Sequence, residues 1–242
     1  MTARTAPASI AEPPGMLCGM AERTETVNHP LFARLYARMT EHESAEQEEH
    51  RRATLAGLRG RVIEVGAGNG RNFGFYPAAV DAVDAVEPEP HLRALAHEAA
   101  ARTAIEITVV DALADSLPFD DASFDAAVTT LVLCSVPDQQ AALRELRRIL
   151  RPDGELRFLE HVHAQRQPLR AVQSLADAST LWPRLTGGCH AARDTLRAIE
   201  QAGFAVTDLR RFDFTPGRPV PGVPHILGRA TRGVGGPGAE PE

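Results

Sequence analysis

The residues with the clearest chemical meaning lie in the stretch VIEVGAGNGRNF, residues 62–73. A short apolar run carries an acid, Glu64, and three glycines follow at Gly66, Gly68 and Gly70. Glycine permits tight turns that side chains forbid, and it lets a ligand approach the backbone closely. The stretch therefore predicts a loop that cradles a nucleotide or a nucleoside, at the start of a helix whose amide groups favour an anionic moiety.

Two further acids follow apolar runs that are typical of strands. Glu87 follows residues 82–86, and Asp111 follows residues 105–110. In doubly wound sheets, ligands bind beyond the carboxyl ends of the strands, where the strand order reverses. We expect Glu87 to accept hydrogen bonds from both hydroxyls of a ribose, and Asp111 to receive an adenine amino group.

The glycine spacing distinguishes between two kinds of cofactor. A nicotinamide fingerprint reads G-x-G-x-x-G, and its third glycine lets helix and strand pack closely. Here Arg71 occupies that position, and the actual spacing is G-x-G-x-G. Glu64 suits an ammonium group and would repel a pyrophosphate. S-adenosylmethionine has an ammonium, a carboxylate, a ribose and an adenine but no phosphate, so the pattern favours it over a nicotinamide dinucleotide.

Strand and helix patterns alternate along the rest of the chain, which predicts an α/β fold with a parallel sheet and helices on both faces. Strand patterns cover residues 61–65, 82–86, 105–110, 124–133, 155–160, 205–212 and 225–230. Helical patterns cover residues 31–39, 91–101, 139–150 and 192–203, the third capped by Asp138. The polar stretch 40–52 predicts a solvated helix face that continues to residue 58, and RPDG at 151–154 predicts a turn.

Bulk composition excludes several classes of protein. The chain has 242 residues and a formal net charge of -6, which disfavours nucleic acid as a partner. Its three cysteines, Cys18, Cys134 and Cys189, form no CxxC pair, so a disulfide framework or a zinc site is not expected. No apolar stretch is long enough to span a membrane, and the N-terminus lacks a signal-peptide core. We expect a soluble cytoplasmic protein without a metal, and nothing in the sequence indicates an oligomeric state.

Four stretches together carry a family resemblance. VIEVGAGNG, DAVEPEP, SLPFDDASFDAAVTTLVLCSV and RELRRILRPDGELRFLEHV match, in order, the motifs of class I S-adenosylmethionine-dependent methyltransferases. This resemblance covers residues 61–230 and implies a Rossmann-like, seven-stranded, mostly parallel sheet. HPLFARLYARM also resembles the start of quinone-type C-methyltransferases, in which an N-terminal helix covers the cofactor; Tyr36 would then face the site.

Shorter stretches resemble one group within that family. NFGFYP, TLVLCSV, EHV, GGC and PHILG look like the methyltransferase-like seven group of alkyl thiol methyltransferases. The expected organisation is a single domain over residues 26–231, with lid helices at 26–58 and a substrate-pocket insertion at 165–190. Disordered tails at 1–25 and 232–242 would flank this domain.

The resemblance also implies a role for each matched residue. Glu64 would lie near the methionine ammonium, and Gly66, Ala67 and Gly68 would wrap the methionine and the ribose. The remaining cofactor contacts would come from Glu87 and Pro88 at the ribose, from Asp111 and Ala112 at the adenine, and from Leu131 over the ligand.

Methyl transfer from a sulfonium is an in-line displacement, so the protein mainly positions and desolvates the reactants. If the acceptor is a thiol, a general base would help to remove its proton. The candidate bases are His161 and His190, and the insertion with Leu181 and Trp182 is expected to form the wall of an apolar acceptor pocket. The favoured reaction is S-methylation of a small-molecule thiol. Two alternatives stay open: C- or O-methylation of an aromatic or quinone-like metabolite, and a non-catalytic protein that binds S-adenosylmethionine.

Overall fold

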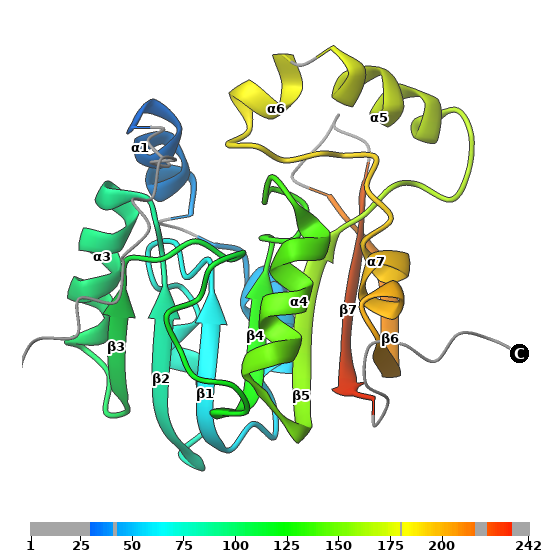
Figure 1. Cartoon of the computed structure of the whole chain (residues 1–242). Helices are drawn as coiled ribbons and strands as arrows, with labels where there is room; N and C mark the ends of the chain where they lie inside the picture. The colour runs from blue at the N-terminus through cyan, green and yellow to red at the C-terminus, as the bar shows by residue number, and fades with distance from the viewer. Residues whose placement is uncertain (1–29, 41–42, 180, 216–221, 234–242) are drawn as a thin grey trace, which may run out of the picture.

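A computed structural model of the chain describes residues 30–40, 43–179, 181–215 and 222–233, which form a seven-stranded sheet (Figure 1). The strand order is β3-β2-β1-β4-β5-β7-β6, and only β7 runs antiparallel to its neighbours. The strands are β1 (Gly60–Val65), β2 (Val80–Val86), β3 (Glu106–Val110), β4 (Phe124–Thr130), β5 (Leu150–His161), β6 (Phe204–Phe214) and β7 (Val223–Arg232). The predicted seven-stranded, mostly parallel sheet is confirmed.

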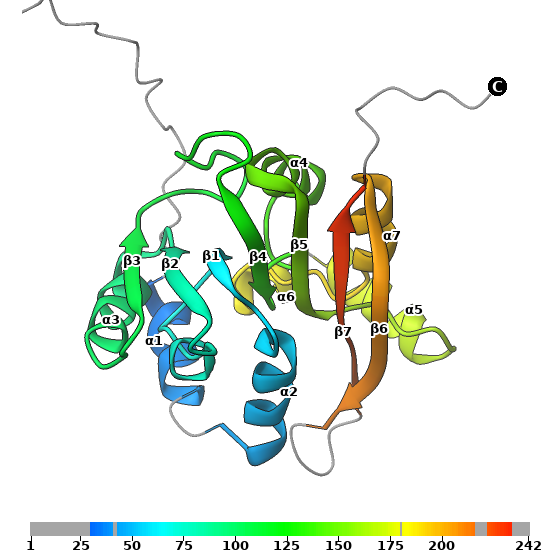
Figure 2. The same cartoon turned by 90° about the horizontal axis from the view of Figure 1, so that it is seen from below.

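Helices cover both faces of the sheet, as Figure 2 shows from below. The helices are α1 (Pro30–Met39), α2 (Ala45–Leu55), α3 (Pro90–Ala100), α4 (Gln139–Ile149), α5 (Leu169–Ala178), α6 (Leu181–Leu185) and α7 (Thr195–Gln201), with a short 3-10 turn at η1 (Phe73–Phe75). α4 and α7 pack on one face, and α2 and α3 pack on the other. α1, α5 and α6 lie beyond the carboxyl ends of the parallel strands (Figure 1).

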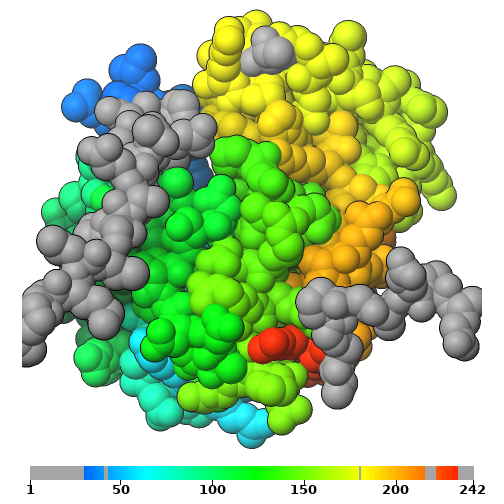
Figure 3. Space-filling view, viewed as in Figure 1, coloured from blue at the N-terminus to red at the C-terminus, as the bar shows by residue number. Residues whose placement is uncertain are grey.

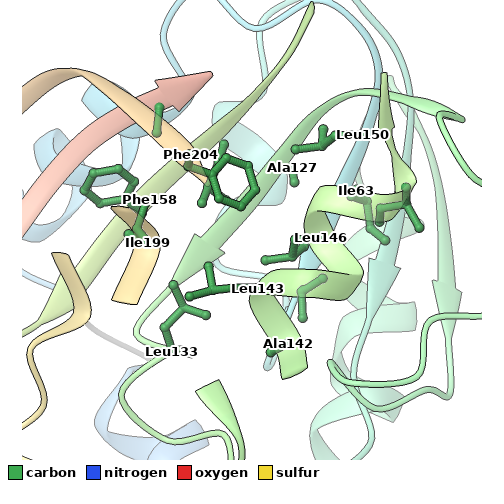
Figure 4. Packing of buried hydrophobic residues seen from close by; sticks show 14 of the residues in the cluster. Ile63, Ala127, Leu133, Ala142, Leu143, Leu146, Leu150, Phe158, Ile199 and Phe204 are labelled. Carbon is green, nitrogen blue, oxygen red and sulfur yellow. The ribbon is translucent and has the colours of Figure 1, made fainter. Parts of the chain in front are cut away.

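The larger core lies between the sheet and α4 (Figure 4). Leu143, Leu146 and Ile149 recur at helical spacing on one face of α4 and are fully buried against Phe158 of β5. The predicted cap is present, because the side chain of Asp138 accepts a hydrogen bond from the backbone N–H of Ala141 at 2.9 Å. Because α4 is packed in this way, the position of the loop between β4 and α4 is fixed relative to the sheet.

Three predicted boundaries are wrong for identifiable reasons. β4 ends at Thr130 rather than at residue 133, because Leu131 takes a left-handed conformation (φ 60°) that turns the chain out of the sheet. RPDG is no free turn but a bulge inside β5, since Leu150 already pairs with Phe124. The helix expected over residues 40–58 is shorter at both ends, since α2 begins at Ala45 and ends at Leu55.

Several predictions concern residues at the edges of the described ranges. β7 includes Arg232, which therefore belongs to the sheet rather than to the predicted tail 232–242. Residues 1–25, 26–29 and 234–242 lie outside the described residues, so their predicted order or disorder stays a prediction. Within the described ranges, no helix combines the length and apolar content that crossing a bilayer requires.

Two leucine variants test whether the α4 interface carries the stability of the domain. Leu146 is fully buried, whereas Leu175 on α5 is 73% exposed. We expect Leu146→Ala to lower the free energy of unfolding by about 2–5 kcal/mol, because it removes apolar contacts and leaves a cavity. Leu175→Ala should change it by less than about 0.5 kcal/mol. Urea unfolding followed by circular dichroism measures both, and equal losses would contradict this assignment of the core.

Candidate functional site

A pocket opens at the carboxyl ends of β1, β2 and β4, where the strand order reverses. The loops after β1 and β4 diverge at this point, which is where doubly wound sheets bind ligands. α1 and the chain just after α6 border the opening, and Figure 3 shows them as blue and yellow masses at this end of the molecule. The lining residues are Phe32, Tyr36, Val65, Gly66, Gly68, Val86, Glu87, Pro88, Glu89, Leu92, Ala112, Leu113, Ala114, Asp115, Thr130, Leu131, Val132, Ser135, Val136, Pro137, Asp138, Thr186 and Gly187.

The glycine loop after β1 forms the floor of this pocket. Gly66 and Gly68 both have left-handed backbones, with φ of 71° and 57°. A Cβ atom on Gly66 would lie 2.3 Å from Cγ2 of Val132, so no side chain fits there. A Cβ atom on Gly68 would make only ordinary contact with the Tyr36 ring, at 3.5 Å. Glycine is therefore required at position 66 by close packing and favoured at position 68 by its left-handed backbone.

Glu87, directly after β2, places a carboxylate in the pocket wall. It is buried, and its oxygens accept hydrogen bonds from the backbone N–H groups of Gly68 (2.8 Å) and Glu89 (2.9 Å). Burial raises the pKa of Glu87, and these two N–H donors oppose the rise. Each carboxylate oxygen keeps a free lone pair. The side chain is thus held in one orientation and can still accept two hydroxyl groups.

The charge of the lining limits the ligand. Four acids reach the pocket, at Glu87, Glu89, Asp115 and Asp138, and the described lining residues include no arginine, lysine or histidine. The other walls are mostly apolar. A phosphate or a pyrophosphate would find no cation here, whereas a neutral nucleoside or a ligand with a positive charge is accommodated.

Seven of the ten predicted cofactor residues line this pocket. They are Tyr36, Gly66, Gly68, Glu87, Pro88, Ala112 and Leu131. Ala67 is buried behind the loop, and its N–H donates to the carbonyl of Val86 at 3.0 Å. Asp111 turns away and pairs with Arg93 at 3.1 Å, so the next residues, Ala112 to Ala114, form the wall instead.

Glu64 also lies outside the pocket, beneath the glycine loop. Its buried carboxylate accepts hydrogen bonds from Nδ2 of Asn72 (2.9 Å) and from the hydroxyl of Tyr76 (2.7 Å). Alternation along β1 points Glu64 and Val65 in opposite directions, and only Val65 reaches the pocket. Burial raises the pKa of Glu64 to about 7, although both hydrogen bonds oppose the rise. A direct contact with an ammonium group stays a prediction.

Arg51 of α2 extends this buried network to the N-terminal helices. Its Nη1 donates to Oδ1 of Asn72 at 2.9 Å, and its other nitrogens donate to both oxygens of Glu43 at 2.6 and 2.7 Å. The side chains of Arg51 and Glu43 are only 8% and 2% exposed, so the predicted solvated face of residues 40–52 is wrong at these positions. The apolar neighbours exclude water, and the ion pair with its amide partner compensates the buried charge.

A turn after β4 forms another wall, and Glu160 at the end of β5 holds it. The buried Glu160 carboxylate accepts from the N–H groups of Val132 (3.3 Å) and Cys134 (3.4 Å). Burial raises the pKa of Glu160 to about 7. Leu131, in its left-handed conformation, starts this turn and lines the pocket. Sequence reasoning missed Glu160, although it is an acid at a strand end, like Glu87.

Neither predicted catalytic histidine lines the pocket. His161 is 7% exposed, and its Nδ1 faces Sγ of Cys189 at 3.6 Å. The ring of His190 lies with its Nδ1 3.9 Å from Asp177. Their predicted roles as bases remain predictions.

The insertion touches the pocket less than its sequence suggests. The side chains of Leu181 and Trp182 are 59% and 43% exposed, and only Thr186 and Gly187 of this segment line the pocket. A Cβ atom on Gly187 would lie 2.2 Å from the Phe32 ring, so α1 and the insertion meet at this glycine. No group of three or more histidines, cysteines or carboxylates in the described residues is arranged to hold a metal ion.

Comparison with known proteins places this geometry in context. A family model described as a methyltransferase domain matches residues 63–158. The chain is 36% identical to the thiol S-methyltransferase TMT1B of Mus musculus over 208 residues, which cover 84% of this chain and 83% of the mouse protein.

Solved structures share the fold at low sequence identity. A SAM-dependent methyltransferase from Thermotoga maritima superposes with a TM-score of 0.61 at 22% identity, covering 84% of this chain and 97% of that one. The geranyl diphosphate C-methyltransferase of Streptomyces coelicolor A3(2), solved with S-adenosyl-L-homocysteine, gives 0.59 at 17% identity and covers 78% and 77%.

The pKa of Glu64 predicts how stability depends on pH. Because the folded-state pKa of about 7 lies above the ordinary value of 4.5, the folded state holds this proton more tightly. The resulting stabilisation is complete below pH 4.5 and is lost as the pH rises through 7. Glu64→Gln should remove up to about 3 kcal/mol of the decline between pH 5 and pH 8. Urea unfolding across that range measures it, with the exposed Glu98→Gln as a control; equal slopes in both variants would contradict the assignment.

Proposed function

The chain belongs to the class I S-adenosylmethionine-dependent methyltransferases, close to the thiol S-methyltransferases, and we propose that it methylates the sulfur of a small-molecule thiol. Family membership follows from the extent of identity with the mouse relative, and the thiol acceptor is inferred from that relative's name. The observation that carries the cofactor assignment is the acidic, phosphate-excluding pocket around Glu87. When bound there, S-adenosylmethionine supplies a methyl group that its sulfonium charge has already activated.

Each wall of the pocket has a task in this proposal. Glu87 accepts hydrogen bonds from the ribose hydroxyls, and the apolar stretch at Ala112 packs against the adenine. The backbone at Gly66 and Gly68 lies beside the methionine and the ribose, and Leu131 covers the ligand from the turn after β4. Because these walls are largely apolar, they exclude water from the reacting centre and hold donor and acceptor in line.

The protein needs to contribute only modestly to removing the proton from the acceptor thiol. A free thiol has a pKa of about 8.5, so a few per cent is thiolate at neutral pH. A general base would add about 10²–10⁴-fold. His161 and His190 stay our proposed bases because both adjoin Cys189, two residues beyond the pocket residue Gly187. In this scheme the acceptor enters beside the insertion and reaches the pocket past Gly187.

Isothermal titration calorimetry tests the cofactor assignment. We expect S-adenosylhomocysteine to bind and NAD to give no heat of binding. Glu87→Gln keeps the shape of the side chain but loses its charge, so the affinity for S-adenosylhomocysteine should fall roughly 10- to 150-fold, corresponding to about 1.5–3 kcal/mol. Glu98→Gln, at an exposed position that does not line the pocket, should bind normally. Binding of NAD alone would end the methyltransferase proposal, and an unchanged affinity in Glu87→Gln would remove the ribose role.

A matched acceptor screen tests the substrate class. The full chain would be incubated with S-adenosylmethionine and thiophenol, phenol or hydroquinone, and methylated products measured by mass spectrometry. Methylthiobenzene should form, with no methylation of the two oxygen compounds. Products only from the oxygen acceptors, or on ring carbon, would favour the C- or O-methyltransferase alternative. Tight cofactor binding without turnover of any acceptor would favour a non-catalytic binding protein.

A further inference from the structure

Two thiols and a histidine meet just behind the pocket wall. Sγ of Cys189 lies 3.6 Å from Nδ1 of His161, and the thiols of Cys134 and Cys189 are close enough for each to influence the ionisation of the other. The two backbones also run close together, since the N–H of His190 donates to the carbonyl of Cys134 at 2.8 Å. A Cβ atom on Gly188 would lie 2.8 Å from the carbonyl oxygen of Ser135, which confirms the tight approach.

The two cysteines differ in accessibility and in ionisation. Cys134 is buried, whereas Cys189 is partly exposed. The neighbouring Cys134 thiol and then the hydrogen bond with His161 lower the pKa of Cys189, even though burial opposes the shift. The same proximity of the two thiols, together with burial, raises the pKa of Cys134. The pair therefore consists of a partly exposed thiol that ionises more readily than an ordinary cysteine and a buried thiol that ionises less readily.

His161 supports this arrangement. It is 7% exposed, and its Nε2 is buried without a hydrogen-bond partner. The ring therefore directs its polar interaction through Nδ1 at the sulfur of Cys189. Neither cysteine lines the cofactor pocket, and no metal-binding group was found among the described residues. A buried histidine aimed at a partly exposed sulfur with a lowered pKa is typical of a reactive cysteine rather than a packing cysteine.

We propose that Cys189 and Cys134 form a thiol–disulfide exchange site for low-molecular-weight disulfides, with Cys189 as the attacking thiolate and Cys134 as the resolving thiol.

The exchange proceeds in two balanced steps. The Cys189 thiolate attacks one sulfur of a disulfide RSSR; the S–S bond breaks, and RS⁻ leaves with the electron pair and takes up the proton that Cys189 released on ionising. Cys134 then attacks the sulfur of Cys189, and the second RS⁻ leaves with the proton that Cys134 gives up. The protein loses two electrons and two protons to form a Cys134–Cys189 bond, and RSSR becomes two RSH. An external dithiol restores the reduced pair.

A disulfide between Cys134 and Cys189 would constrain the walls of the cofactor pocket, although neither cysteine lines it. Cys134 belongs to the turn that Glu160 holds, and Cys189 follows Gly187, so a bond between them would join two walls of the pocket. The thiols released are of the class that the enzyme would methylate. That last link rests on the proposed function, whereas the exchange itself does not.

The test uses the full-length chain with Cys18→Ser, because Cys18 lies outside the described residues and would also react. Dithiobis(nitrobenzoate) releases a coloured aryl thiolate for each exchange step. We expect two aryl thiolates per chain, no aryl group left on the protein, and a Cys134–Cys189 cross-link in the peptide map. Cys134→Ser should release one aryl thiolate and keep an aryl adduct on Cys189. Cys189→Ser should react at least tenfold more slowly, because only the buried Cys134 remains.

Two results would overturn the proposal: equally fast reaction of Cys189→Ser, or a stable aryl adduct without a cross-link in the parent. The peptide map of the parent needs no variant, so a variant that misfolds does not weaken the test. S-adenosylhomocysteine binding measured on the same protein separates the two proposals. Failed exchange with intact binding counts against the thiol pair alone, and failed methylation leaves the exchange result unchanged.

Discussion

The buried guanidinium of Arg51 is the constraint around which the site is arranged. An uncompensated charge at this depth would cost several kcal/mol, so Glu43 and Asn72 must both be in place when the chain folds. Asn72 in turn holds Glu64, which lies under the glycine loop. The polar network thereby fastens α2 and the segment before it to the end of β1. The end of β1 beneath the glycine loop and α2 are consequently parts of one hydrogen-bonded unit.

The wall of the pocket formed by the turn after β4 is also held by a buried acid, Glu160. Glu160 holds the N–H groups of the turn after β4, much as Glu87 holds the N–H groups of Gly68 and Glu89. In each case a carboxylate at the end of a parallel strand fixes a loop that has no regular secondary structure. Of these acids, only Glu87 also lines the pocket. Glu64, Glu87 and Glu160 are all buried at the same edge of the sheet, so what distinguishes Glu87 is the direction of its side chain.

That difference explains what the sequence can predict. Local patterns were sufficient for the sheet, for the backbone turns of the glycine loop and for the place of Glu87 in the pocket wall, because each depends on residues close together in the chain. The helix expected to start at the glycine loop is wrong, since only the 3-10 turn η1 follows it. Side-chain direction depends on tertiary partners, so Glu64 and Asp111 were expected in the pocket and instead bond to Tyr76 and Arg93. The burial of Arg51 was missed because a charged run indicates solvent unless its partners are known. His161 likewise does not line the pocket, because its ring contacts Cys189 of the insertion instead.

The reversed direction of β7 has a practical consequence. His225 pairs with His161 at the pocket edge of the sheet, whereas Thr231 pairs with Glu155 at the opposite edge. Gly233, the last described residue, therefore stands a full strand length away from the opening. A fluorophore or a surface-immobilisation handle attached at that edge would leave small molecules free to diffuse in and out. The same handle on α1 would sit beside the entrance and obstruct them.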